Sequence, residues 1–171
     1  MSEHNTHNSF LEAYEMYADD IFRFCMSKTS NRDDALDITQ ETFAKTWEYL
    51  KNDNTVDNIR AFLYRVARNR IYDFYRKKKS ESLDAAQEEG YEFENDDHER
   101  MVATSNARFS MKILQKLEDT DRELLIMRFI DELSIPEIAD ITNQKENTVS
   151  VQVHRALKKA QDIISQHIHH E

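Results

Sequence analysis

The chain of 171 residues contains one glycine, Gly90, and one proline, Pro136. This scarcity excludes the glycine-rich loops that bind phosphates or dinucleotides. It also disfavours tight β-hairpins, which depend on glycine at the turn. Few residues interrupt long stretches of helix-forming residues. The sequence therefore predicts an all-α fold.

Cysteine and long apolar runs are equally scarce. Cys25 is the only cysteine, so no disulfide can form within the chain. No run approaches the ~20 apolar residues of a membrane span. The stretch from Met1 to Ser9 is polar and has no apolar signal core. These features predict a cytoplasmic protein without membrane insertion.

Groups that perform catalysis or hold metals do not cluster within the helical motifs. Five of the seven histidines lie near the ends of the chain, at positions 4, 7, 167, 169 and 170. A metal site needs fixed geometry and supporting partners, and no Ser/His/Asp or Cys/His set stands in an ordered region. We therefore expect no enzyme activity, no cofactor and no metal site.

The hydrophobic pattern divides the chain into three parts. Residues 10–79 carry three apolar stripes with helical spacing and predict a small helical domain. Residues 80–107 hold nine acidic side chains and one basic one, the composition of a flexible linker. Residues 108–166 predict a second helical domain. The stripes of the first domain are Phe10, Tyr14, Tyr17, Ile21 and Phe24; Ala35, Ile38, Thr42, Thr46 and Leu50; and Ile59, Phe62, Leu63, Val66, Ala67, Ile71 and Phe74.

The second domain carries the signals of a helix-turn-helix. Ser134 and Glu137 have the spacing of a capping box, as do Thr120 and Glu123. Asn143 tolerates the left-handed conformation that a turn requires. A short capped helix, a turn and a longer helix form a helix-turn-helix, which places its second helix in the major groove of DNA.

That second helix is expected from about Lys145 to Ile164. The face opposite its apolar stripe is polar and basic. Arginine and lysine pair with phosphate or guanine, and glutamine suits adenine. The alternative is an ordinary three-helix bundle with a solvated charged face. The candidate DNA contacts on this face are Ser150, Gln152, His154, Arg155, Lys158 and Lys159.

The third helix of the first domain interleaves cations with aromatic rings. Its stretch 60–79 has eight basic residues and one acidic residue, Asp73, although the whole chain has a net charge of -10. Cations attract the phosphate backbone, and aromatic rings stack on unpaired bases. This pattern suits single-stranded or opened DNA. Ordinary packing of the tyrosines beside a solvated helix end is the alternative. The candidates are Arg60, Tyr64, Arg65, Arg68, Asn69, Tyr72, Tyr75, Arg76, Lys77, Lys78 and Lys79.

The helix before it presents a polar face. Positions 37, 40, 41, 44 and 48 follow helical steps and carry acidic and amide groups, apart from one alanine. Such a face can dock on a basic or helical partner, and a solvated face is the alternative.

Three stretches resemble, in the same order, motifs of bacterial RNA polymerase sigma factors. Residues 37–43 (DITQETF), with Trp47, resemble their core-binding helix. Residues 59–79 (IRAFLYRVARNRIYDFYRKKK) resemble the promoter-melting helix that reads the -10 element. Residues 121–141 (DRELLIMRFIDELSIPEIADI) and 146–160 (ENTVSVQVHRALKKA) resemble the -35-reading helix-turn-helix. Because no third domain separates the halves, the resemblance is to the extracytoplasmic-function (ECF) group.

The resemblance implies a protein that binds core RNA polymerase, at the β′ clamp helices and the β subunit, and directs promoter recognition and melting. It implies polymerase contacts at Asp37, Gln40, Glu41, Phe43 and Trp47, although Phe43 and Trp47 could equally be core. It implies capture of a flipped -10 base by the loop 51–58, which includes Asn54 and Asn58. It implies -10 contacts along the face of residues 60–79 described above. It implies -35 contacts at Ser150, Val151, Gln152, His154, Arg155 and Lys158.

Two departures and two alternatives remain. Ser150 and Gln152 stand where the family commonly has basic residues, so a weak -35 contact is expected. A stand-alone helix-turn-helix regulator would bind duplex DNA without polymerase. A sigma-like decoy would bind polymerase without reading DNA. Many relatives are held inactive by an anti-sigma factor, and the sequence identifies no such partner.

Overall fold

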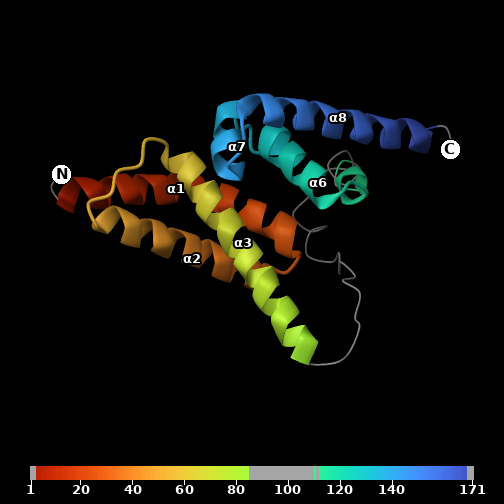
Figure 1. Ribbon diagram of the computed structural model, residues 1–171. Coiled ribbons are helices and arrows are strands. Elements are labelled where there is room, and N and C mark those ends of the chain that lie inside the picture. Colours follow the sequence, from red (N-terminus) through yellow and green to blue (C-terminus); the bar gives the residue numbers. More distant parts are fainter. Residues whose placement is uncertain (1–2, 85–109, 111, 169–171) are drawn as a thin grey trace. The chain divides into compact units, whose positions relative to one another are not determined.

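The computed structural model describes residues 3–84, 110 and 112–168. The chain forms two compact units, and the described residues contain helices and no strand (Figure 1). The predicted all-α fold with two helical domains is therefore confirmed. The acidic linker predicted over 80–107 lies, from residue 85 onward, outside the described residues. The elements are α1 (Glu3–Thr29), α2 (Arg32–Lys51), α3 (Ile59–Asp84), α6 (Asp119–Leu125), η1 (Ile126–Ile130), α7 (Ile135–Thr142) and α8 (Glu146–Ile168).

The first unit is a bundle of three helices. Helices α1 and α2 lie side by side, and α3 packs against both (Figure 1). Each of the three predicted stripes contributes buried side chains, and each large apolar side chain buried in this way adds roughly 1.5–3 kcal/mol of stability. The fully or almost fully buried residues include Ile21, Phe24, Cys25, Met26, Ala35, Ile38, Leu63, Tyr64, Ala67 and Ile71.

Cys25 belongs to this core. Burial raises the pKa of the Cys25 thiol to about 12, although a hydrogen bond with Thr39 acts in the opposite direction. Because the thiolate is the reactive form of cysteine, this side chain acts as a small apolar group in the core.

The inner face of α2 includes three threonines among its apolar residues. The hydroxyls of Thr39, Thr42 and Thr46 each donate to the backbone carbonyl four residues earlier, at 2.7, 2.7 and 2.8 Å. A buried hydroxyl without a partner would be costly. These bonds let a partly polar stripe pack into the bundle with its hydroxyls satisfied.

The second unit contains the predicted helix-turn-helix. The N–H of Ser134 donates to the Glu137 carboxylate at 2.8 Å, and the Glu137 N–H donates to the Ser134 hydroxyl at 3.3 Å, so the capping box that begins α7 is confirmed. Leu133 and Ile138, which flank this cap, are completely buried. Asn143 ends α7 in the left-handed conformation, with φ 54° and ψ 46°. Helix α8 then begins three residues later.

Three local predictions differ from the structure. The capping box at Thr120 is wrong: α6 begins at Asp119, and its N-cap Glu118 makes no side-chain cap bond. Helix α3 continues to Asp84, beyond the expected end at residue 79. Helix α1 begins at Glu3, before the expected start at residue 10. Helical periodicity locates the buried centre of a helix better than its solvated ends.

The π-helical segment η1 was not predicted. The N–H of Asp131 donates to the carbonyl of Ile126 at 2.9 Å, five residues back. The N–H of Leu133 reaches the carbonyl of Met127 at 2.8 Å. The wider turn leaves Phe129 and Ile130 exposed beside the buried Met127.

Replacing Asn143 tests the turn of the helix-turn-helix. Asn143→Gly should unfold within a few tenths of a kcal/mol of the parent, whereas Asn143→Ala should lose about 1 kcal/mol, because a Cβ without a polar group disfavours φ 54°. Urea unfolding measures both, with Gln144→Ala as the neighbouring exposed control. Equal stability of the alanine and glycine variants would contradict this account.

Candidate polymerase and DNA interfaces

The polar face of α2 is exposed as the spacing predicted. Asp37, Gln40 and Glu41 all lie open to solvent, and Glu48 follows on the same side. Glu48 pairs with Lys45 at 2.9 Å, and the opposite side of the helix carries the buried threonines. The helix therefore presents an acidic and amide surface that a partner can reach.

Phe43 and Trp47 lie beside this face but pack against α1. Phe43 is only 4% exposed, and its ring centroid lies 4.8 Å from that of Tyr14 and 6.3 Å from that of Phe10. The prediction of Phe43 as a polymerase contact is therefore wrong, because α1 covers it. Trp47 is half-buried, 5.1 Å from Phe10 and 5.7 Å from His7 between ring centroids. The aromatic cluster holds α2 in place on α1.

The loop between α2 and α3 is mostly exposed, and one hydrogen bond holds it to each helix. The side chain of Asn54 donates to the carbonyl of Tyr49 at 2.9 Å. The side-chain oxygen of Asn58 accepts from the N–H of Ala61 at 3.0 Å and caps α3. Asp53 takes a left-handed φ of 57°. Both asparagines thus shape the loop, and their contact with a DNA base remains a prediction.

The outer face of α3 carries the predicted combination of cation and ring. The guanidinium of Arg68 lies 4.7 Å from the ring centroid of Tyr72 and donates to the Tyr72 hydroxyl at 2.8 Å. Tyr72 is 43% exposed, and such a pair offers both charge and a stacking surface. Asn69, Arg76 and Lys77 are exposed, whereas Arg60 and Arg65 are half-buried.

Two tyrosines of α3 are positioned differently from the prediction. Tyr64 is completely buried, with its ring 5.2 Å from that of Phe24, so its prediction as a DNA contact is wrong. The reason is that α3 packs on both α1 and α2, and its buried arc is wider than a single stripe. Tyr75 is half-buried, and its hydroxyl donates to the carbonyl of Lys28.

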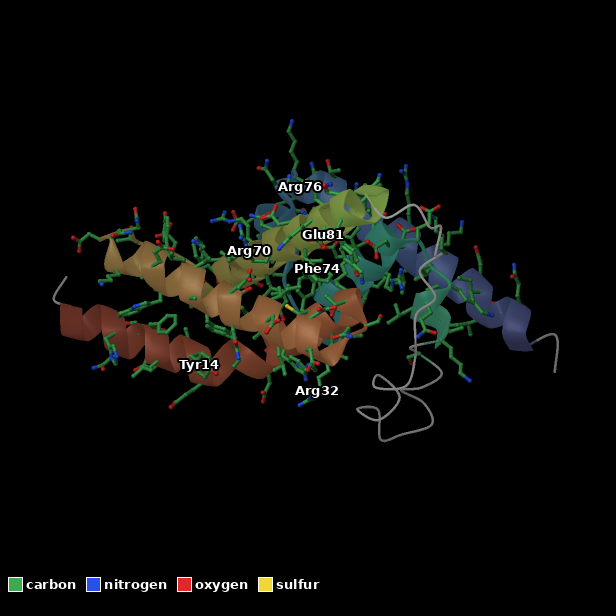
Figure 2. All side chains as sticks on the ribbon, turned by 90° about the horizontal axis from the view of Figure 1, so that it is seen from below. Tyr14, Arg32, Arg70, Phe74, Arg76 and Glu81 are labelled. Atoms are coloured by element: carbon green, nitrogen blue, oxygen red, sulfur yellow. The ribbon has the colours of Figure 1, made fainter. Side chains whose placement is uncertain are left out.

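Asp73 joins two arginines of the basic face. Its carboxylate accepts from Arg70 at 2.9 Å and also from Arg76, one turn to either side. Figure 2 shows Arg70 and Arg76 along the same stretch of α3. The carboxylate occupies these guanidinium groups much as a phosphate would. The only acidic residue in 60–79 therefore reduces the positive charge of this face.

The recognition helix α8 exposes most of its predicted contacts. Gln152 is half-buried, and Val149, Val153 and Ala156 form the buried side. Lys159 is drawn towards its own unit, because it forms ion pairs with Asp121 and with Glu118 at 3.9 Å. The hydrogen bond that Lys159 donates to the Asp121 carboxylate raises the pKa of Lys159. The exposed candidates are Ser150, Val151, His154, Arg155 and Lys158.

Two further features concern the described residues only. No group of histidine, cysteine, aspartate and glutamate side chains in them converges as a metal site would. None of their helices combines the length and apolarity needed to cross a membrane.

Comparisons with known proteins find one matching family model in each of the two units. Residues 13–81 match the family model of Sigma-70 region 2, and residues 111–159 match that of Sigma-70 region 4. RNA polymerase sigma factor SigV of Bacillus subtilis is 31% identical over 142 residues, which is 81% of each chain. ECF RNA polymerase sigma factor SigW of the same organism is 31% identical over 165 residues, 89% of this chain and 88% of the relative.

Two solved structures share the fold. The sigma factor RpoE from Bartonella quintana, in complex with the anti-sigma factor NepR, superposes with a TM-score of 0.71 at 23% identity, covering 92% of this chain and 97% of the other. CnrH, in complex with the cytosolic domain of CnrY, gives 0.68 at 20% identity, with 94% and 90% covered.

These matches place the chain in the sigma-70 family of transcription initiation factors. Within that family it belongs to the ECF group of RNA polymerase sigma factors. Members of the family direct initiation and catalyse no reaction themselves, so the prediction that the chain is not an enzyme is confirmed.

Removal of the Asp73 carboxylate tests whether it competes with DNA phosphate for Arg70 and Arg76. Asp73→Asn should release Arg70 and Arg76 for phosphate, so the complex with core polymerase should bind DNA more tightly. The slope of log Kobs against log salt should steepen by about one, measured by fluorescence anisotropy.

Asp20→Asn is the matched control, because it removes a similarly spaced pair with Arg23 on α1. Both variants should lose no more than about 0.5 kcal/mol of stability. An unchanged salt slope for Asp73→Asn would show that the pair only stabilises the helix.

Proposed function

We propose that this sigma factor binds core polymerase and promoter DNA through two different faces of its first unit. The polar face of α2, with Asp37, Gln40 and Glu41, docks on core polymerase at the β′ clamp helices. The basic and aromatic face of α3 binds the -10 region, and the loop 51–58 captures a base of the non-template strand. The observation that carries this proposal is the exposure of both faces on adjacent helices of one bundle.

DNA opening in this proposal needs no hydrolysis. Cations along α3 attract the phosphate backbone. Exposed rings such as Tyr72 bind unstacked bases, which duplex DNA does not offer. Because these contacts stabilise opened DNA more than closed DNA, binding itself shifts the equilibrium towards melting.

The second unit is proposed to contact the -35 element weakly. Ser150 and Gln152 add no positive charge, and Lys159 is paired with acidic groups of its own unit. Fewer phosphate contacts mean lower affinity. Arg155 and Lys158 remain as exposed cations on α8, so promoter choice should depend more on the -10 half.

The partners follow from family membership and from the related structures. Core polymerase, including its β subunit, and promoter DNA are the proposed partners, which implies a cytoplasmic location. An anti-sigma factor is also proposed, because RpoE of Bartonella quintana is bound by NepR.

The two alternative functions each leave one surface without a use. A stand-alone regulator has no need of the exposed polar face on α2. A decoy that binds polymerase alone has no need of the Arg68–Tyr72 pair on α3, whose tyrosine is exposed. The sigma factor function uses both surfaces.

The polymerase face is tested by the double variant Gln40→Ala/Glu41→Lys. Its affinity for core RNA polymerase should fall by about a hundredfold, as expected when a charged contact is replaced by repulsion. Pull-down and anisotropy titration measure the loss. Glu12→Lys, at an exposed glutamate of α1, is the matched control and should bind normally. Binding by the double variant at the parental affinity would favour the stand-alone regulator.

The DNA face is tested by the double variant Arg68→Glu/Arg76→Glu. It should still bind core polymerase but should lose promoter opening, because two attractions for phosphate become repulsions. Permanganate reactivity of unpaired thymines on a promoter selected with the parent protein reports opening. Arg23→Glu/Arg32→Glu reverses two exposed charges elsewhere in the unit and should open normally. Normal opening by the α3 variant would support a decoy or another DNA face.

A further inference from the structure

Tyr49 lies in the last turn of α2, and its ring belongs to neither the polar face of α2 nor the aromatic cluster on α1. It is 40% exposed. Its ring packs against that of Phe62 on α3, with centroids 4.9 Å apart and planes only 34° from parallel. The guanidinium of Arg65 lies 5.3 Å from the Phe62 ring centroid. An exposed ring, a buried ring and a cation are thus in contact at the junction of two helices.

The position of Tyr49 separates it from the polymerase face. Tyr49 follows Asp37 by twelve residues, which rotates it by about 120° around the helix. Trp47 turns the other way and packs against α1. Tyr49 is also about 80° from Glu41 around the helix, so its ring lies on a different side of α2 from the polar face.

Tyr49 also anchors the loop that leads to α3. Its carbonyl accepts the hydrogen bond from the Asn54 side chain at 2.9 Å. Tyr49 therefore carries the exposed ring and also accepts the hydrogen bond that holds the loop. The loop at Asn54 and the last turn of α2 at Tyr49 therefore lie next to each other.

We propose that Tyr49 is a stacking platform for an unpaired base of single-stranded DNA, with Phe62 as its support and Arg65 as the adjacent cation. The tilted packing on Phe62 holds the Tyr49 ring before DNA arrives, so little side-chain freedom is lost on binding. Stacking on a ring face does not depend on the identity of the base. The platform therefore adds affinity for the opened strand without sequence preference, and it rests on the proposed function.

The test measures binding of single-stranded DNA to the complex of the full chain with core polymerase. The probe is a labelled oligonucleotide selected from a randomised pool on the parent complex, and its duplex form is the second probe. Tyr49→Leu should weaken binding of the single strand by about tenfold and leave duplex binding unchanged. Tyr49→Phe, which keeps the ring, should bind within about twofold of the parent.

Tyr14→Leu is the matched control. Tyr14 is also about half exposed and packs on one ring, that of Phe43, but it lies on α1 (Figure 2). This variant should bind both probes normally. If Tyr49→Leu loses helix content by circular dichroism, Tyr49→Trp replaces it, and its fluorescence above the Trp47 background should change with the single strand and not with the duplex.

Several outcomes overturn the platform. They are parental binding by Tyr49→Leu, equal losses for single strand and duplex, an equal loss for Tyr14→Leu, or an unresponsive Tyr49→Trp. If the parent complex binds the single strand no better than core polymerase alone, the proposed function fails together with the platform. If the parent complex binds the single strand better than core polymerase alone does, but Tyr49→Leu binds it as tightly as the parent, the function stands and the platform alone is rejected.

Discussion

The packing of α3 into the seam between α1 and α2 determines which side chains the first unit presents. Leu63, Tyr64 and Ala67 are completely buried in this seam, and Tyr64 contacts Phe24 of α1. Contact with two helices widens the buried arc of α3, so the arc left for solvent is narrow. This holds for residues 59–71, whereas from Arg76 to Glu81 every residue is exposed and the basic end of α3 is open to solvent on all sides.

The same packing explains how a chain with a net charge of -10 can offer a DNA-binding face. Field strength near a surface depends on local charge, because salt screens charges beyond about 8–10 Å. Successive basic residues of α3 are at most six positions apart, roughly 9 Å along the helix axis, and most of the acidic residues of 80–107 come later in the chain. Asp73 is the exception, since it lies within the basic face and pairs with Arg70 and Arg76. It moderates attraction to any phosphate and leaves more of the discrimination to contacts with opened bases.

Much of the fold follows from patterns that act over one or two turns. The stripes of α1, α2 and α3, the capping box at Ser134 and the left-handed Asn143 are each set by neighbours close in sequence. The burial of Tyr64 and Phe43 depends on which helices cover them, and spacing within one helix does not contain that information. The π-turn η1 shifts the register by one residue, so an α-helical pattern misplaces Phe129 and Ile130.

The candidate site likewise has one part that the sequence predicts and another that depends on contacts between helices. Exposure of Asp37, Gln40 and Glu41 could be predicted from their spacing, whereas Tyr49 could not be recognised, because its significance comes from Phe62 on another helix. Both features belong to α2, which therefore has three distinct sides: Trp47 towards α1, Tyr49 towards α3, and the polar face towards solvent. A partner that fixes the polar face also fixes the last turn of α2 and the loop attached to it. In the proposed function, polymerase binding thus orients the surface that receives the opened strand, and the rigid aromatic contacts on both sides of α2 transmit that orientation.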